Sequence, residues 1–491
     1  MFLKAKKIDI STGGPLIALL NEKDAALLDL NPLDRIEIKG KKHKIIVAVD
    51  ITDKEIRKGH IGLLKETLEK FPFKNGEKLK VKIAETPRSV EFIKKKLDGK
   101  ELKKSEIDEI IKDVVENELT EIELTYFVSA SYKGGFTDKE TEYLTKAIIK
   151  NGTKLRLKSK IIVDKHSTGG LPNNRTTMLI VPIVAAAGLI MPKTSSRAIT
   201  SAAGTADVME TLCGVCFPAR KVEKIVKKTN ACIVWGGAMN LASADDKLIK
   251  VRHPLRLDPE GMLLSSILAK KAAVNSTHVL IDIPIGKTAK TTTLKEGKTL
   301  KRKFKFLGKS LGMKVKVMLS DGSQPIGNGV GPNLEARDVL YILMRDKRAP
   351  KDLEEKIIYM STLILKMVGI KFAKKKVREI LNLGLANAKF REIIKAQGGN
   401  PKVKPEDLKV GRYKYEVKAT RSGKISSIDN KRIAKIARVA GCPESNESGL
   451  YIEIKLRQKV KRNQILFTIY SESREKLKYA KSFVKNTIKI Q

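Results

Sequence analysis

The stretch Val163–Pro182 reads VDKHSTGGLPNNRTTMLIVP and decides the fold class of the central part of the chain. An apolar run, predicted to be a strand, ends at Asp164; a loop with paired glycines follows, and helical sequence begins near Thr176. Such a loop exposes backbone N–H groups and directs a helix N-terminus toward a ligand. With the charge of Lys165 and the hydroxyl of Ser167, it predicts an anion site, most simply for phosphate. The alternative is an ordinary glycine-rich turn, because the GxxxxGK spacing of a Walker loop is absent.

A second hydroxyl-rich segment, PKTSSRAITSAAGTADVME, spans Pro192–Glu210 and again stands between a strand-like run and a helix. Two such loops, one strand–helix unit apart, would lie side by side at the carboxyl edge of a parallel sheet, where open α/β folds bind ligands. A third segment, RHPLRLDPEGMLLSSILAKK, spans Arg252–Lys271. Its Ser266 and Lys270 are spaced i, i+4 and share one helix face. The alternative for the lysines of this helix is an ordinary surface position.

Working outward, strand-like runs alternate with helical sequence from residue 161 to about residue 320, which is typical of an α/β region with mostly parallel strands. The chain is therefore interpreted as a multidomain α/β protein. Four domains are predicted: a β-rich, barrel-like domain at 1–86, a helical bundle at 87–155, an α/β domain at 156–410 that binds phosphate and substrate, and an α+β domain at 411–491. Later helices near 256–275 are expected to pack on the helical bundle.

Capping residues predict where some helices begin. Ser105 and Thr137 are predicted N-caps in the helical bundle, because each precedes acidic residues and a periodic apolar run. Near the C-terminus a single helix is predicted over Arg474–Ile488.

Composition and charge narrow the function classes. The chain has 491 residues and a formal net charge of +43. Its lysines are spread along the sequence rather than gathered in one arm, so the simplest interpretation is a lysine-rich proteome and not nucleic-acid binding. An enzyme for anionic substrates would gain some electrostatic steering from this charge. The longest apolar run, Met178–Met191, has 14 residues and is too short to span a bilayer. No signal-peptide-like stretch begins the sequence and cysteines are few. We therefore expect a cytoplasmic protein with no membrane or nucleic-acid partner.

No metal or redox site is predicted. Cys213 and Cys216 have CxxC spacing, but neither a second cysteine pair nor a nearby histidine pair accompanies them. Two partly buried thiols are the simpler interpretation. The histidines other than His166 are isolated in the sequence and are interpreted as structural.

The ordered motifs KHSTGG, SSR, GTAD and SSILAKK resemble those of the thymidine/pyrimidine-nucleoside phosphorylase family, over nearly the whole chain. The N-terminal extension resembles the extended form of that family, which comprises a thymidine phosphorylase group and the AMP phosphorylases. The resemblance implies a pentosyltransferase that cleaves an N-glycosidic bond with inorganic phosphate and releases a free base and a sugar 1-phosphate. It also implies no cofactor beyond phosphate as co-substrate, and a homodimer or larger homo-oligomer.

The resemblance also implies roles for individual residues. The implied phosphate ligands are Lys165, Ser167, Gly169, Gly170, Thr177, Ser195 and Thr205. The implied base or nucleotide contacts are Ser196, Arg197, Ala198, Ile199, Thr200, Ser201, Arg256, Ser266, Lys270 and Lys290. His166 or Asp258 is implied as the proton donor to the leaving base. The LPNNRTT segment carries one residue more than the shorter enzymes, so Thr176 is the alternative to Thr177.

Two substrates remain open from the sequence. The segments GGLPNNRTT and STHVLIDIPIGKTAK look more like those of the thymidine phosphorylase group, so thymidine is the first predicted substrate. The alternative is AMP, giving adenine and ribose 1,5-bisphosphate, because Arg197 and Lys290 would suit a 5′-phosphate. Two remote alternatives are a phosphoribosyltransferase, whose Mg²⁺-binding acidic pair is not seen in the sequence, and a basic nucleic-acid-binding protein.

Overall fold

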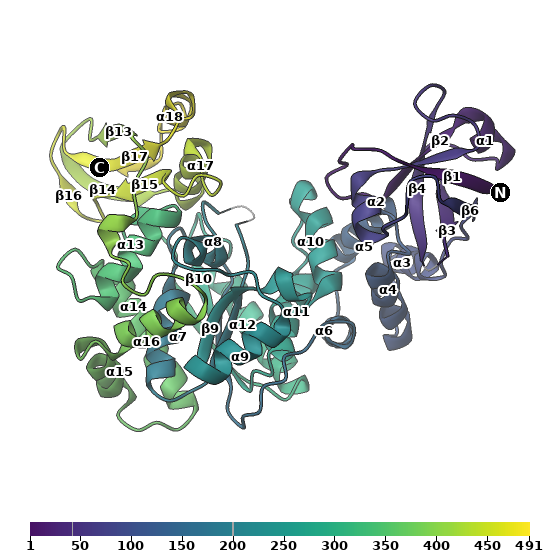
Figure 1. Cartoon of the computed structure of the whole chain (residues 1–491). Helices are drawn as coiled ribbons and strands as arrows, with labels where there is room; N and C mark the ends of the chain where they lie inside the picture. Colours follow the sequence, from purple (N-terminus) through teal and green to yellow (C-terminus); the bar gives the residue numbers. More distant parts are fainter. Residues whose placement is uncertain (42, 199–200) are drawn as a thin grey trace. The chain divides into compact units, whose positions relative to one another are not determined.

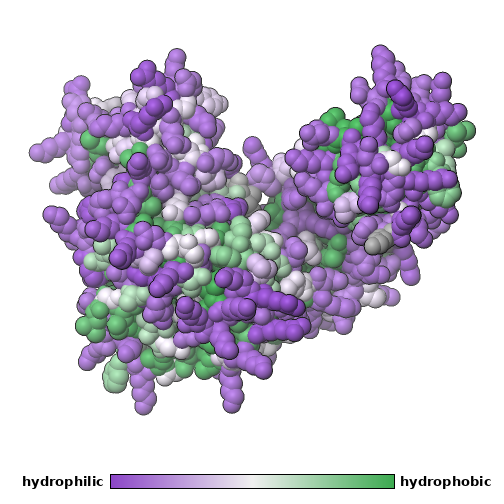
Figure 2. Space-filling model, viewed as in Figure 1, coloured by the Kyte–Doolittle hydropathy of each residue, from purple (hydrophilic) through white to green (hydrophobic). Residues whose placement is uncertain are grey.

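The computed structural model describes residues 1–41, 43–198 and 201–491. It divides the chain into two compact units (Figure 1). Unit 1 comprises Met1–Asn151 and Ser243–Ser265, and unit 2 comprises Gly152–Ala242 and Ser266–Gln491. The visible face of both units is largely hydrophilic (Figure 2). Among the described residues, no helix has both the length and the apolar character that crossing a membrane requires.

Unit 1 begins with a closed β-barrel in the strand order β1-β5-β2-β4-β3-β6. The strands are β1 (Phe2–Lys7), β2 (Ile17–Asn21), β3 (Arg35–Lys39), β4 (Lys44–Thr52), β5 (His60–Leu63) and β6 (Lys78–Ile83), with helices α1 (Glu22–Leu27) and α2 (Lys65–Lys70) between them. Alternation drives closure: in β3 the side chains of Ile36 and Ile38 are fully buried while their neighbours face outward. The domain predicted to be barrel-like is thus a closed barrel.

A helical bundle completes unit 1. Its helices are α3 (Ser89–Leu97), α4 (Lys104–Glu116), α5 (Glu121–Gly134), α6 (Asp138–Lys150) and the later α10 (Ser243–Leu255). The predicted cap at Thr137 is confirmed, because its hydroxyl accepts a hydrogen bond from the Glu140 N–H at 3.1 Å. The predicted cap at Ser105 is wrong. Helix α4 begins at Lys104 with Lys103 as its N-cap, two residues before the start that a Ser105 cap implies, and Glu106 accepts from the Lys103 N–H at 2.7 Å.

Unit 2 contains the predicted parallel sheet. Strands β11 (Lys314–Asp321), β10 (His278–Ile285) and β7 (Val163–Ser167) pair in parallel, as do β8 (Met191–Ser195) and β9 (Ala231–Trp235). A parallel bridge between Ile162 and Ile190 links β7 to β8. The covering helices are α7 (Thr176–Ala186), α8 (Thr205–Glu210), α9 (Ala219–Thr229), α11 (Glu260–Ala273), α12 (Leu294–Ser310), α13 (Pro332–Leu343), α14 (Lys351–Met367), α15 (Ala373–Asn382) and α16 (Leu385–Ala396).

The end of β7 differs from the prediction. The strand continues to Ser167 rather than ending at Asp164, and Lys165, His166 and Ser167 pair with β10. The last three positions of this strand are polar residues. The apolar run in the sequence therefore ends before the strand itself ends. Helix α7 begins at Thr176 as predicted and is buried on all sides.

The C-terminal part of unit 2 holds two antiparallel sheets, ordered β12-β15-β17-β13 and β16-β14-β18. The elements are β12 (Gly329–Val330), β13 (Tyr413–Lys418), β14 (Gly423–Ile428), α17 (Asn430–Ala440), β15 (Gly449–Ile452), β16 (Lys459–Val460), β17 (Ile465–Ser471), α18 (Arg474–Lys481) and β18 (Ile488–Ile490). The helix predicted over Arg474–Ile488 is therefore too long: it stops at Lys481, and Ile488 pairs with β14 instead.

Candidate active site

The first loop of the candidate site leaves the carboxyl end of β7. The side chain of Lys165 is 2% exposed, and its ammonium donates to the Thr177 hydroxyl on the first turn of α7 at 3.1 Å. The preceding Asp164 is fully buried and accepts from Lys271 of α11 at 2.6 Å, with Lys193 of β8 at 3.7 Å. Strand and helix thus bring three buried lysines around one carboxylate.

Burial dominates the protonation of this cluster. The pKa of Lys165 is lowered to about 7, chiefly by burial; the charges of Lys356 and Arg175 act in the same direction, while Asp282 and Asp164 oppose the shift. Burial also holds the pKa of His166 well below its usual range, assisted by four surrounding lysines. The site therefore carries a neutral imidazole and an ammonium ready to lose its proton. An anion placed here would favour the charged lysine.

Several hydroxyls at these strand and helix ends lack partners. Within the described part of the chain, Thr168 Oγ1, Thr176 Oγ1, Thr194 Oγ1 and Ser195 Oγ are buried without a hydrogen-bond partner. Buried polar groups in folded proteins are normally satisfied, so an unpartnered group calls for an explanation. A group rich in acceptor oxygens, such as phosphate, would satisfy these hydroxyls.

The second loop runs from β8 to α8 and is built around Asp207. Its carboxylate accepts from the N–H groups of Ala198 and Gly204, both at 2.7 Å. The Arg197 guanidinium donates to Asp207 at 3.2 Å and to Glu210 at 2.8 Å, and lies 5.1 Å from the Trp235 ring centroid. Arg197, which the sequence offered as a cation for a 5′-phosphate, is therefore already paired with two acids.

The remaining predicted contacts divide between the units. Arg256 and Asp258 are exposed residues of unit 1, in the loop after α10, and Arg252 donates to Asp258 at 3.4 Å. Ser266 and Lys270 lie on α11 in unit 2 and are half-buried. Among the other predicted nucleotide contacts, Ser196 and Ser201 are exposed, and Ser201 donates to the Ala203 carbonyl at 3.0 Å. Ile199 and Thr200 lie outside the described residues.

The paired glycines are required by geometry. Gly169 and Gly170 have φ of +92° and +82°, a region that favours glycine. A Cβ on Gly170 would lie 2.3 Å from the backbone nitrogen of Lys290. The absence of a side chain thus allows the loop after β10 to lie directly against the loop after β7, which places Lys290 beside the candidate anion site.

Some buried residues of the site have no counterpart in the sequence prediction. Lys193 and Lys271 lie within the sequence motifs, but the motifs assign them no role. Lys356 of α14 pairs with Asp282 of β10 at 2.9 Å, and Asp282 also accepts from Ser320 at 2.6 Å. Lys193 and Asp282 could have been found from the sequence, because each is a charged residue inside an apolar run. The position of Lys356 in an amphipathic helix gives no such signal.

The two cysteines of the CxxC motif differ in exposure. Cys213 is buried and Cys216 is exposed, whereas two partly buried thiols were expected. Burial raises the pKa of the Cys213 thiol to about 12. No group of three or more potential metal-binding side chains is found within residues 1–41, 43–198 and 201–491.

Comparison with known proteins gives the family. A model of the glycosyl transferase family a/b domain matches residues 159–386, the helical bundle domain of the same family matches 90–152, and a pyrimidine nucleoside phosphorylase C-terminal domain matches 424–491. The AMP phosphorylase of Pyrococcus furiosus is 46% identical over 96% of this chain and 94% of its own length. That of Thermococcus kodakarensis is 44% identical over 98% and 95%.

Solved structures agree at the level of the fold. The anthranilate phosphoribosyltransferase of Thermus thermophilus has a TM-score of 0.51 at 17% identity and covers 62% of this chain and 98% of its own. The enzyme from Saccharomyces cerevisiae, in complex with PRPP and Mg, has the same TM-score of 0.51 at 16% identity, covering 63% and 97%. With these domains in this order and near full-length relatives, the chain belongs to the thymidine/pyrimidine-nucleoside phosphorylase family and is a pentosyltransferase of the phosphorylase type.

Proposed function

We propose that the protein is an AMP phosphorylase. In this reaction an oxygen of inorganic phosphate attacks C1′ of AMP, the bond from C1′ to adenine breaks, and adenine leaves with ribose 1,5-bisphosphate as the second product. The observation that carries the proposal is the similarity, over at least 94% of both lengths, to proteins named AMP phosphorylase. The sequence motifs favour thymidine as the substrate, whereas the names of these relatives favour AMP.

The chemistry of the β7 end supports the proposal. Cleavage with oxocarbenium character needs an anionic nucleophile held in place and water kept away from the sugar. Lys165, the unpartnered hydroxyls of Thr168 and Ser195, and the N-terminus of α7 supply donors for phosphate. Lys290, beside Gly170, is the cation we assign to the 5′-phosphate of the nucleotide. Arg197 is a weaker candidate for that contact, because Asp207 and Glu210 already neutralise it.

We propose His166 or Asp258 as the proton donor to the leaving adenine; Asp258 is exposed and accepts a hydrogen bond from Arg252 at 3.4 Å. The pKa of His166 lies well below its usual range, so the imidazole of the ligand-free protein is neutral near neutral pH and lacks the second, acidic N–H proton. Ser266 and Lys270 remain the proposed contacts of the base. We further propose a homodimer or larger homo-oligomer that uses inorganic phosphate and no other cofactor.

Base release tests the proposal directly. The protein is incubated with AMP, adenosine, CMP, UMP, thymidine and uridine, each with and without inorganic phosphate, and the free base is resolved by chromatography. Phosphate-dependent release from AMP but not from adenosine is expected. Release from thymidine or uridine, with AMP inert, would reverse the substrate choice. Release without phosphate would contradict the phosphorylase reaction.

A lysine pair supplies the matched control. Lys165→Ala is expected to abolish phosphorolysis while leaving the fold intact, because it removes the buried ammonium that faces phosphate. Lys375→Ala removes an exposed lysine of α15 and should retain full activity. Circular dichroism establishes that both variants are folded. Full activity of the Lys165 variant would contradict the phosphate assignment.

A further inference from the structure

Two of the hydroxyls assigned to phosphate accept hydrogen bonds from fixed donors. Asn174 Nδ2 donates to Ser167 Oγ at 2.9 Å, and Arg175 Nη1 donates to Thr205 Oγ1 at 2.9 Å. An amide NH₂ and a guanidinium can only donate, so each hydroxyl must aim its own hydrogen elsewhere. Ser167 and Thr205 are thereby set as hydrogen-bond donors. That is the orientation that a bound anion requires.

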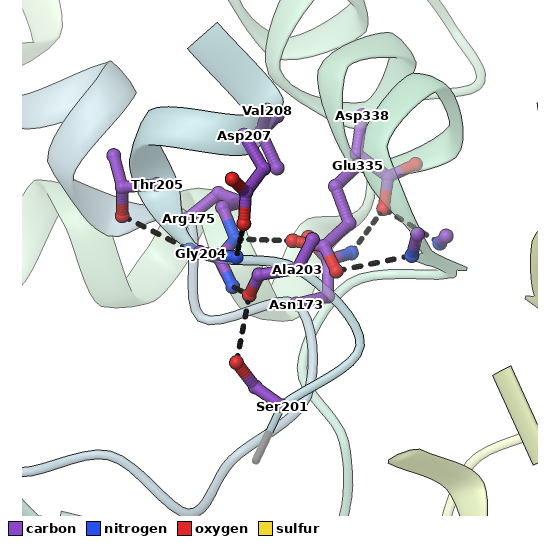
Figure 3. A network of polar contacts seen from close by, with 12 residues as sticks. Asn173, Arg175, Ser201, Ala203, Gly204, Thr205, Asp207, Val208, Glu335 and Asp338 are labelled. Atoms are coloured by element: carbon purple, nitrogen blue, oxygen red, sulfur yellow. Dashed lines mark hydrogen bonds and ion pairs between the residues drawn. The ribbon is translucent and has the colours of Figure 1, made fainter. Parts of the chain in front are cut away.

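The Arg175 side chain is itself held from several directions (Figure 3). Its Nε donates to Glu335 on the first turn of α13, and its Nη2 donates to the Ala203 carbonyl at 2.7 Å. Glu335 is 1% exposed, and its second oxygen accepts from the Gly331 N–H at 3.1 Å. The guanidinium therefore ties the loop before α8 to the N-terminus of α13 and has little freedom to turn.

The residue two positions earlier anchors the same turn. Asn173 has a φ of +55° and donates through Nδ2 to Asp338 at 2.6 Å. Asp338 also accepts from the N–H groups of Asn328 and Gly329, at 2.7 Å and 2.9 Å. Three consecutive residues, 173–175, thus fix the turn to α13 and direct one donor to each hydroxyl-bearing loop.

We infer that Arg175 is a positioning residue that orients the Thr205 hydroxyl toward phosphate, that Glu335 holds Arg175 in place, and that Asn174 does the same for Ser167. This inference rests on the proposed function only in naming phosphate as the anion. A buried ion pair contributes little stability compared with apolar side chains of equal volume, so stability alone is a weak reason for burying the Arg175–Glu335 pair here.

The test is a double-mutant cycle between the pair and its target. Arg175→Met combined with Glu335→Gln removes both charges together, so no uncompensated carboxylate is left buried, and the introduced amide keeps an oxygen for the Gly331 N–H. Thr205→Val removes the oriented hydroxyl at nearly constant volume. Calorimetric titration with inorganic phosphate measures the dissociation constant of each variant, and steady-state assays with AMP measure KM for phosphate and kcat.

Each change alone is expected to weaken phosphate binding by about tenfold, and the triple variant should bind no more weakly than Thr205→Val alone. Arg175→Lys keeps a donor and the charge opposite Glu335 and should restore most of the affinity. Equal further loss in the Thr205→Val background would overturn the inference, since a merely structural pair acts independently of that hydroxyl. Unchanged binding in the Arg175→Met/Glu335→Gln variant would overturn it as well.

A second buried pair gives the matched control. Lys96 and Glu140 of unit 1 are 4% and 0% exposed and lie 2.8 Å apart. Lys96→Met should lower the melting temperature without changing phosphate affinity. If phosphate binding shows the coupling but AMP is not cleaved, the AMP assignment fails and the positioning role stands. If AMP is cleaved and the coupling is absent, the AMP assignment stands and the positioning role fails.

Discussion

Lys165 combines a buried ammonium with a pKa of about 7, and this fixes how pH acts on the site. Below about pH 7 the ligand-free lysine is charged, and above it the amine is neutral. Bound phosphate favours the charged form and raises the pKa. Between the two pKa values, binding must therefore take up a proton, and affinity falls as pH rises.

We expect phosphate affinity to fall by up to tenfold per pH unit above about pH 8, where phosphate is mostly dianionic. Calorimetry in two buffers of different ionisation enthalpy measures the protons taken up on binding. Lys165→Met should take up fewer protons than the natural protein; Lys193, whose pKa is also held well below its usual range, continues to contribute. Identical uptake in both proteins would show that Lys165 does not titrate with binding.

Thr176 and Thr177 differ in what their hydroxyls contact, and this separates the two positions. Thr176→Val removes a buried hydroxyl that has no partner in the described structure, so we expect a gain of about 1 kcal/mol in the free energy of unfolding. Thr177→Val removes the acceptor of Lys165 and should destabilise the protein. Denaturant titration checks both signs.

Phosphate titration completes that comparison. If the Thr176 hydroxyl awaits phosphate, the more stable Thr176→Val variant binds phosphate more weakly. A destabilised variant with unchanged affinity would instead show that the hydroxyl is satisfied within the protein and has no part in the site.

At the scale of elements, the N-terminus of α6 carries two linked contacts. Thr137 caps the helix, and Glu140 both completes the capping box and pairs with Lys96. We expect Thr137→Ala to lower the free energy of unfolding by about 1 kcal/mol, because one helix N–H loses its acceptor. Chemical denaturation of the natural protein and the variant measures the difference.

Thr299→Ala on α12 is the matched control for that change. Its hydroxyl donates only to the Lys295 carbonyl within an exposed helix face, so the expected change is within about 0.5 kcal/mol. Equal effects of the two substitutions would contradict the capping argument.

At the scale of the whole molecule, the proposed phosphate contacts belong to one unit. Lys165, Thr176, Ser195 and Thr205 all lie in unit 2, whereas the barrel lies in unit 1. Saturating inorganic phosphate alone should slow amide hydrogen exchange in peptides covering 163–177 and 201–210 and leave 1–86 unchanged. Exchange measured by mass spectrometry checks this, with equimolar sulfate as a comparison anion. Protection confined to the barrel would place the anion elsewhere.

The sequence by itself determined the strand–helix alternation, the two hydroxyl-rich loops and the family. These features are local: paired glycines, hydroxyls and apolar runs act through backbone conformation and spacing of a few residues. Lys165 could be assigned to an anion site because its charge comes directly after an apolar run and shortly before the paired glycines. Thr137 could be assigned as a cap because the residues it contacts are three positions away.

The tertiary structure alone decided which distant charges surround that site. Lys356 and Glu335 lie more than 150 positions from Lys165, and only folding places them beside Asp282 and Arg175. It also decided that Arg197 is neutralised by Asp207 and Glu210, and that β7 runs on to Ser167. The physical reason is that burial and charge pairing depend on all neighbours in space, whereas sequence patterns report only neighbours along the chain.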